Sequence, residues 1–201
     1  MGRYTGPKDK LSRREGKDLF GTGGAGLERR LGQPPGEHGR GRRRRRQSVY
    51  ARQLREKQMV KRIYGVRERQ FRRFFEMARR SDEPTGIALL KLLERRLDNV
   101  VYRLGFARTR PQARQFVTHG HVSVDGRRMR IPSYLVKSEQ AVRLGESARR
   151  IPDVEALEEN PPAVPGWLKR ADGEGQVLRE PERGEIDPDI DEGLILAFYS
   201  R

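Results

Sequence analysis

Cysteine is absent from this 201-residue chain, which excludes disulfides, thiol chemistry and cysteine zinc sites. No run of 18 or more apolar residues occurs either, so the sequence predicts no membrane-spanning helix. Residues 1–7 contain no apolar segment of the kind that a secretory signal needs. Together these absences lead us to expect a cytoplasmic protein with no contact to a membrane.

Apolar residues are also scarce, at 34% of the chain, and they are unevenly distributed. They occur singly in residues 1–48, whereas residues 81–150 hold enough of them to bury a core. Half of the 22 glycines precede Arg42. We therefore expect residues 1–48 to form an arm that is disordered in the free protein and ordered by what it binds.

The charge is strongly positive, +16, from 44 Lys and Arg against 28 Asp and Glu. Residues 151–201 depart from this balance, because their acidic residues outnumber the basic ones. The net positive charge of the first 150 residues therefore exceeds the +16 of the whole chain. A field of that size indicates a polyanionic partner. Many of these charges are arginines, whose planar guanidinium binds phosphate bidentately and stacks on bases, so we interpret the partner as RNA.

Helical periodicity begins after Ser48, a suitable N-cap, and helices are predicted over 49–64, 67–79, 86–104 and 110–119. The second of them has an apolar face formed by Phe71, Phe74, Phe75 and Ala78. Thr109 is the expected cap of the last helix, and Gly120 its expected end.

After Gly120 the apolar period changes to two, and Asp125-Gly126 is a two-residue hairpin signal. Strands are predicted over 122–124, 127–131, 134–136 and 139–144. Residues 152–166, rich in proline and acidic residues, predict a linker or loop. Periodicity does not separate helix from strand in the apolar run 194–199, although the acidic residues before it favour helix.

Patterns that could indicate an enzyme carry little weight. Residues 21–26 match the dinucleotide-binding glycine pattern, but no buried strand precedes them, so a flexible glycine loop explains them better. No carboxylate cluster joins His119 and His121 in a metal site. A nucleophile elbow is absent. We therefore expect no enzymatic activity, metal, cofactor or small-molecule substrate.

The clearest local unit is a helix, a second basic helix and a Val-x-Val-Asp-Gly hairpin, which begins at Arg96 and ends at Leu144. This order resembles the small RNA-binding module named after small-subunit ribosomal protein S-four. The matching residues are Arg96-Leu97-Asp98, Gly105, Thr109-Arg110, Ala113-Arg114, Val117, Gly120 and Val122–Gly126.

The resemblance continues over nearly the full length. Further segments similar to the bacterial S-four family are Arg3-Tyr4, Gly6-Pro7, Lys10–Gly16, Asp18–Phe20, Pro35–Gly39, Gln53–Gln58, Arg62–Gly65, Leu92–Tyr102, Trp167-Leu168, Pro181–Arg183 and Phe198–Ser200. Because some members carry an N-terminal cysteine zinc site and this chain has no cysteine, it resembles the zinc-free form. The five-arginine run 42–46 is richer than the family pattern requires.

The resemblance implies an α+β fold and a division of the chain into four parts. These are a Gly/Arg-rich arm (1–48), a helical domain (49–95) on which 185–201 docks, an RNA-binding module (96–168) with two helices and a small mostly antiparallel sheet, and a connecting loop or strand segment (169–184).

The implied function is that of a structural constituent of the small ribosomal subunit, a primary binder of 16S ribosomal RNA that nucleates assembly of the subunit body. With ribosomal proteins S-five and S-twelve it would influence translational accuracy, and its arm would lie near the channel through which messenger RNA enters. The rival hypotheses are an RNA-modifying enzyme that uses the same module, such as a pseudouridine synthase, and a DNA-compacting protein. The first needs a second, catalytic domain, for which the chain offers no sizeable apolar segment.

The candidate site residues follow from the basic patterns and from the resemblance. The expected RNA-binding residues are Arg3, Arg13, Arg14, Arg42, Arg43, Arg44, Arg45, Arg46, Arg55, Lys57, Lys61, Arg62, Arg69, Arg72, Arg73, Arg108, Arg110, Arg114, Arg127, Arg128 and Arg130. The expected protein-partner residues, which would face S-five, are Asp187, Asp189, Asp191 and Glu192.

Overall fold

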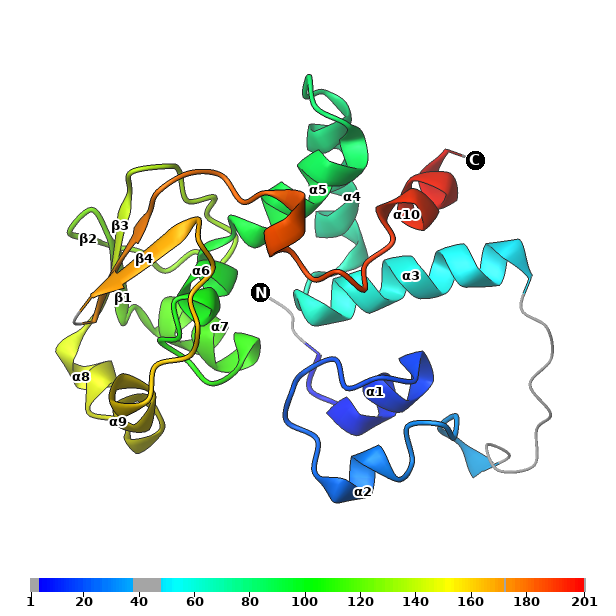
Figure 1. Cartoon of the computed structure of the whole chain (residues 1–201), viewed down its shortest axis with the longest axis horizontal. Coiled ribbons are helices and arrows are strands. Elements are labelled where there is room, and N and C mark those ends of the chain that lie inside the picture. Colours follow the sequence, from blue (N-terminus) through cyan, green and yellow to red (C-terminus); the bar gives the residue numbers. More distant parts are fainter. Residues whose placement is uncertain (1–3, 38–47, 172, 201) are drawn as a thin grey trace. The chain divides into compact units, whose positions relative to one another are not determined.

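The computed structural model describes residues 4–37, 48–171 and 173–200. The chain divides into two compact units, residues 1–75 with 189–201 and residues 76–188. Helices in both units and one antiparallel sheet give the α+β class that the sequence predicts (Figure 1). In the described ranges, every helix is too short or too polar to cross a bilayer.

The first unit is helical. Its elements are α1 (Lys8–Glu15), α2 (Ala25–Glu28), α3 (Val49–Ile63), the first two turns of α4 (Glu68–Arg79) and α10 (Glu192–Tyr199). The predicted start of α3 is confirmed, because the Ser48 side chain accepts a hydrogen bond from the backbone N–H of Ala51 at 3.2 Å. The C-terminal apolar run, which periodicity left open, is the helix α10.

Helix α10 packs on α3, and its end packs on the apolar face of α4 (Figure 1). The Tyr199 ring lies 4.5 Å from the ring of Phe75 and 6.2 Å from that of Phe71, centroid to centroid. The end of the chain thus lies on the aromatic face on which the sequence analysis expects it to dock.

The N-terminal segment makes contacts of its own within this unit. Leu19 and Leu27 are buried, and α1 contacts α3. The Arg13 side chain donates to the backbone oxygens of Gln33 and Pro34, at 3.1 Å each. Residues 4–37 therefore have protein contacts in addition to any that RNA supplies, which the glycine-rich composition did not predict.

The second unit consists of a five-stranded antiparallel sheet and the helices around it. The strands are β1 (Val122–Val124), β2 (Arg127–Arg128), β3 (Ala141–Leu144), β4 (Leu168–Ala171) and β5 (Glu174–Val177), in the order β2-β1-β3-β5-β4. The helices are α5 (Thr85–Glu94), α6 (Leu97–Arg103), α7 (Arg110–His119), α8 (Glu146–Arg149), α9 (Pro152–Glu159) and the 3₁₀ turn η2 (Arg183–Glu185).

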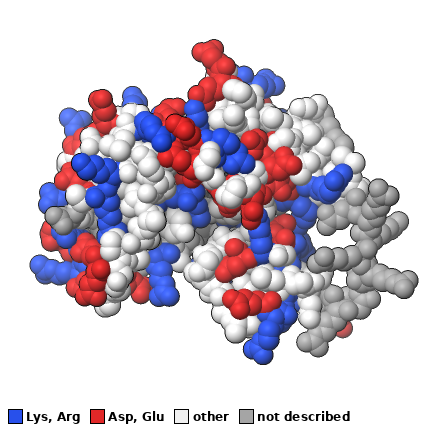
Figure 2. Space-filling model, in the orientation of Figure 1, with Lys and Arg blue, Asp and Glu red and all other residues white. Residues whose placement is uncertain are grey.

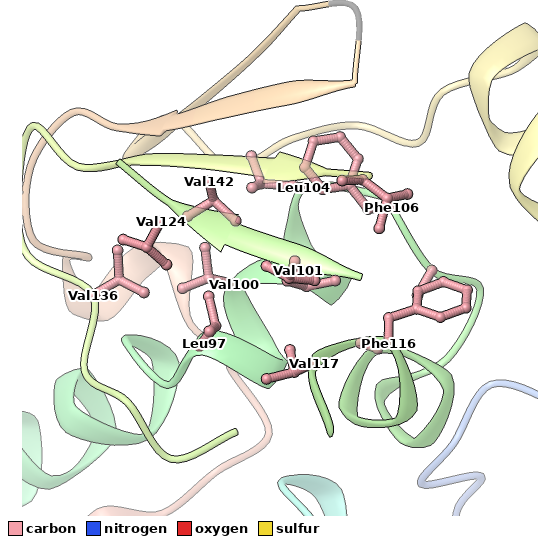
Figure 3. Packing of buried hydrophobic residues seen from close by; sticks show 14 of the residues in the cluster. Leu97, Val100, Val101, Leu104, Phe106, Phe116, Val117, Val124, Val136 and Val142 are labelled. Atoms are coloured by element: carbon pink, nitrogen blue, oxygen red, sulfur yellow. The ribbon is translucent and has the colours of Figure 1, made fainter. Parts of the chain in front are cut away.

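The core of this unit lies between one face of the sheet and the helices α6 and α7. Figure 3 shows side chains of both helices, Val101 and Val117 among them, pointing toward Val124 and Val142 of the strands. Alternate strand residues such as Ser123 and Arg143 face away from this core, as the period of two predicts.

The helix predicted over 86–104 is wrong. Residues 86–104 form two helices, α5 and α6, rather than one, because Arg96 is extended and pairs with Leu135 in an isolated bridge. The loop that follows β2 compensates the break, since the oxygens of Tyr134 and Pro132 accept from the backbone N–H groups of Leu97 (2.8 Å) and Asp98 (3.2 Å). The first N–H groups of a helix have no acceptor within the helix, and here two of them find one in this loop.

Other boundaries also differ from the predicted ones. Residues 134–136 make only the bridge at Leu135 instead of a strand, and the strand predicted over 127–131 ends at Arg128. Residues 152–166, predicted as a loop, begin with the helix α9. Residues 168–177 supply β4 and β5, so the sheet extends beyond residue 168, where the sequence analysis ends the module. Strand β5 pairs with the distant β3, whereas the Asp172-Gly173 pair in the sequence between β4 and β5 is a hairpin signal like Asp125-Gly126, which the sequence analysis did not use.

Candidate RNA-binding surface

Helix α7 and the β1–β2 hairpin form the basic part of the second unit. Thr109 caps α7 by accepting from the N–H of Gln112 at 3.3 Å, and Gly120 ends it with φ +75°, both as predicted. The hairpin turns at Asp125-Gly126, where both residues have positive φ. The Arg128 guanidinium donates to the α7 carbonyl oxygens of Gly120 (2.6 Å) and His119 (3.2 Å), so it joins the hairpin to the end of α7.

A network of side chains fixes the turn of this hairpin. Gln140 donates to the Asp125 carboxylate at 2.6 Å and accepts from the Tyr134 hydroxyl at 3.2 Å. The same carboxylate also accepts from the N–H of Ala141 at 2.8 Å. The turn therefore presents Arg127 and Arg130 from a rigid support.

Four of the predicted arginines of this unit are exposed, among them Arg128, which binds the end of α7. Arg108, at the start of α7, is 71% exposed, and its nearest acidic group is Asp153 at 3.9 Å. Arg127 and Arg130 are exposed, and within the described residues neither side chain makes a hydrogen bond or an ion pair. These last three side chains can bind phosphate groups while breaking few or no contacts within the chain.

Arg110 and Arg114 have intrachain partners that the sequence analysis did not foresee. Arg114 donates to Asp98 at 3.1 Å, and the same carboxylate binds the fully buried Arg96 bidentately at 3.0 and 2.6 Å. The Arg110 Nε donates to the Asn99 side-chain oxygen at 2.8 Å. Both arginines are therefore oriented by the first turn of α6.

In the helical unit, four of the predicted cations surround two carboxylates. Arg55 and Arg62 both bind Glu15, a side chain that is only 4% exposed. Lys57 and Lys61 both bind Glu68, at 3.1 and 2.6 Å. Burial lowers the pKa of Arg55 and of Arg62, and the neighbouring Arg14 adds to this effect, although both arginines remain charged at neutral pH. These pairs join α1, α3 and α4 within the unit.

Of the remaining predicted cations of this unit, Arg13 is partly buried and donates to the backbone oxygens of Gln33 and Pro34, and the other described ones are exposed. The exposed ones are Arg14 on α1 and Arg69, Arg72 and Arg73 on α4, on the side of α4 opposite its buried phenylalanines. Arg3 and the run Arg42–Arg46 lie outside the described residues.

The expected protein-partner acids take part in local structure. Asp189 is 70% exposed and lies 3.4 Å from Lys17. Asp191 caps α10 by accepting from the N–H of Leu194 at 3.2 Å, while its own N–H donates to Glu56. Asp187 and Glu192 are partly buried. This segment therefore both anchors α10 and leaves carboxylate surface open.

The sequence analysis missed two exposed cations on the open face of the sheet, Arg143 of β3 and Lys169 of β4. The alternation of buried and exposed residues in 141–144 could have predicted the position of Arg143. Figure 2 shows Lys and Arg interspersed with Asp and Glu on the face in view. Among the described residues, no cluster of three or more His, Asp or Glu side chains is suited to a metal ion.

Comparison with known proteins identifies the arrangement. The family profile "Ribosomal protein S4/S9 N-terminal domain" matches residues 3–94, and the profile "S4 domain" matches residues 95–142. The chain is 53% identical to the "Small ribosomal subunit protein uS4" of Herpetosiphon aurantiacus, with 100% of each chain covered. The chain belongs to the uS4 family of small ribosomal subunit proteins.

Two further relatives with the same name are the uS4 proteins of Nitrosococcus oceani, 49% identical, and Geobacillus stearothermophilus, 51% identical. Both alignments cover 100% of this chain and 100% of the relative. The uS4 family is one of ribosomal proteins and not of enzymes, which confirms the family and the absence of catalysis that the sequence analysis predicts. The S4-domain match spans α6, α7 and the hairpin, where the exposed arginines lie.

Proposed function

We propose that this chain is a structural component of the cytoplasmic small ribosomal subunit and binds 16S ribosomal RNA directly. The uS4 family membership supports the assembly, and the exposed arginines of the second unit support the contact with RNA. The observation that carries the proposal is the set Arg108, Arg127 and Arg130, presented by α7 and the hairpin turn. Folded RNA is recognised by shape and phosphate position, which suits guanidinium groups held on rigid elements.

The proposal extends to assembly and to translational accuracy. Basic groups on both units, Arg69 and Arg73 of α4 in one and Arg127 in the other, let one chain hold separate RNA helices of a junction. Such a chain binds early and nucleates the body of the subunit. The acidic segment 187–192 would face ribosomal protein S-five and act with S-twelve on accuracy. Ion pairs between exposed groups contribute little each, so such a contact opens and closes easily.

A salt titration of RNA binding tests the contact with RNA. The double change Arg127→Ala and Arg130→Ala removes two exposed cations without removing an intrachain bond, so the fold should remain intact. If both contact phosphates, the slope of log affinity against log salt should fall by about 1.4–1.8, at roughly 0.7–0.9 per contact. The measurement uses a junction fragment of 16S RNA, with duplex DNA at equal salt as the competing ligand.

Arg179→Ala is the matched control, because Arg179 is an exposed arginine that binds Glu185 at 2.8 Å in the acidic part of the chain. It should leave the slope unchanged. An unchanged slope in the double variant, with an intact fold, would rule out the proposed surface. Preference for duplex DNA over junction RNA would rule out the proposed function itself.

We also propose that the run Arg42–Arg46 faces messenger RNA near the channel through which it enters the subunit. Support comes from sequence alone, namely five adjacent arginines directly before α3. Replacing all five by alanine should leave subunit assembly intact and slow translation of structured messages more than that of unstructured ones. Equal effects on both kinds of message would contradict this assignment.

A further inference from the structure

We propose that Asn99 is a positioning residue of the RNA-binding surface, which acts by orienting the guanidinium of Arg110. This inference rests on the proposed contact between the second unit and RNA phosphates. Asn99 is neutral and carries no signal of RNA binding in the sequence. It is only 2% exposed, so it acts through the side chains that it holds rather than by touching RNA.

The hydrogen bonds of Asn99 fix the orientation of its amide. Its side-chain nitrogen donates to the Glu94 backbone oxygen at 2.9 Å and to the Glu94 carboxylate at 2.7 Å. These donors leave the side-chain oxygen directed at Arg110, whose Nε donates to it at 2.8 Å. Because Glu94 is itself held by Arg103 at 3.0 and 2.8 Å, the amide cannot turn without breaking several bonds.

A second contact restricts the plane of the guanidinium. The Arg110 Cζ lies 4.4 Å from the centroid of the Tyr102 ring, within the range of a cation–π contact. One edge of the guanidinium is therefore fixed by Asn99 and one face by Tyr102. The bond to Asn99 uses one of five N–H donors, whereas a bidentate bond to phosphate needs two.

The arrangement differs from an ordinary ion pair in a way that matters for RNA. Arg114, four residues further along α7, is held by the Asp98 carboxylate, which it shares with Arg96. Arg110 is held at 2.8 Å by a neutral amide, which orients the guanidinium without placing a negative charge against it at that bond. A guanidinium that is already oriented loses less side-chain entropy when it binds phosphate.

A double-mutant cycle tests this role. Asn99→Ala should weaken binding of a 16S junction fragment roughly three- to tenfold, the loss expected when a charge-assisted contact is misplaced. Arg110→Ala should weaken binding at least as much and lower the salt slope by about 0.7–0.9. In the Arg110→Ala background, Asn99→Ala should have no further effect on affinity, because the guanidinium through which it acts on RNA is gone.

Val117→Ala is the matched control for a merely structural role, since Val117 is fully buried on α7 and makes no polar side-chain contact. It should lower thermal stability without changing RNA affinity once the protein is folded. An Asn99→Ala effect that persists undiminished in the Arg110→Ala background would overturn the proposal, as would unchanged affinity in a folded Asn99→Ala variant. Failure of the wild-type chain to bind the RNA would instead refute the proposed function.

Discussion

At the scale of single residues, Glu68 illustrates how one carboxylate organises several cations. Lys57, Lys61 and the Tyr199 hydroxyl all donate to it, at 3.1, 2.6 and 2.7 Å. The Lys57 ammonium also lies 4.0 Å from the centroid of the Phe198 ring. Partial burial acts to raise the pKa of Glu68, but the hydrogen bonds outweigh it and lower the pKa from 4.5 to about 2. Burial and the same carboxylate raise the pKa of Tyr199.

This shift predicts a dependence of stability on pH. A carboxylate with a lowered pKa stabilises the fold above its unfolded value, and this contribution is lost as the pH falls from about 5 toward 2. Glu68→Gln should therefore reduce the melting temperature at pH 7, and the difference from wild type should shrink toward pH 2. Glu68 is 48% exposed, so solvent screens the effect and it should be modest. A difference that stays constant over this pH range would contradict the assignment.

The arginines show which part of the site can be predicted from sequence. Side chains such as Arg108 and Arg127 are exposed, and their contact with RNA stays a prediction; helix spacing and the turn determine their positions. The partners of Arg110 and Arg114 could not be predicted. They depend on where the α5–α6 break places Asp98 and Asn99, and that depends on a backbone bridge to Leu135.

Arg96 is the residue on which that break depends. It is fully buried, and its guanidinium binds Asp98 bidentately at 3.0 and 2.6 Å. Arg96→Met keeps the bulk of the side chain but removes the charge, so Asp98 keeps only Arg114 among these partners. We expect a loss of about 3–5 kcal/mol in the free energy of unfolding, the usual effect of breaking a buried ion pair.

Fluorescence of Trp167 during denaturation measures this loss, because Trp167 is the single tryptophan and is buried in the same unit. Arg96→Lys keeps the charge without the planar fork, so its free energy of unfolding should lie between those of wild type and Arg96→Met. Wild-type stability in Arg96→Met would show that the buried pair is dispensable.

At the scale of whole elements, the caps and turns follow local chemistry and were predicted. Ser48, Thr109, Gly120 and the turn Asp125-Gly126 act as their residue types suggest. The elements that were missed depend on distant partners. Strand β5 pairs with the distant β3 and β4 pairs with β5, so the order β2-β1-β3-β5-β4 cannot be obtained from local sequence.

The segment after α9 shows the same dependence. The sequence predicts a linker or loop over 152–166, but Arg170 of β4, just beyond it, donates to the backbone oxygens of Leu104 (3.1 Å), Gly105 (3.2 Å) and Leu157 (3.3 Å). Its guanidinium also lies 5.2 Å from the centroid of the Phe106 ring. One side chain from β4 thus ties α9 to the end of α6.

Gly105 makes this contact possible. It has φ +71°, and a Cβ there would lie 2.6 Å from the Pro162 side chain and 2.7 Å from that of Arg170. Gly105→Ala should destabilise the second unit by more than Gly126→Ala, which also has positive φ but open space around it. The control should lose about 1–2 kcal/mol for the left-handed backbone alone. Equal losses in the two variants, measured by Trp167 fluorescence, would show that the packing against Pro162 is unimportant.

At the scale of the whole molecule, the two compact units divide the chain in an unexpected way. The first unit combines residues 1–75 with the C-terminal residues 189–201, whereas the sequence analysis places the boundary after residue 95. Helix α10 therefore belongs to a unit whose other elements lie more than a hundred residues earlier. Stability of that unit depends on both ends of the chain, although the second unit is continuous in sequence.

Removal of residues 189–201 tests this division. The first unit would lose Ile195, which is fully buried and contributes about 1.5–3 kcal/mol, together with the Tyr199 contacts to Phe75 and Glu68. Helix content should therefore melt earlier, while the Trp167 signal of the second unit keeps its midpoint and the unit keeps its affinity for RNA. Ile195→Ala in the full chain should shift the helical transition in the same direction by less. A parallel loss of the Trp167 transition would mean that the units unfold together, and an unchanged helical transition would mean that α10 does not stabilise the unit on which it packs.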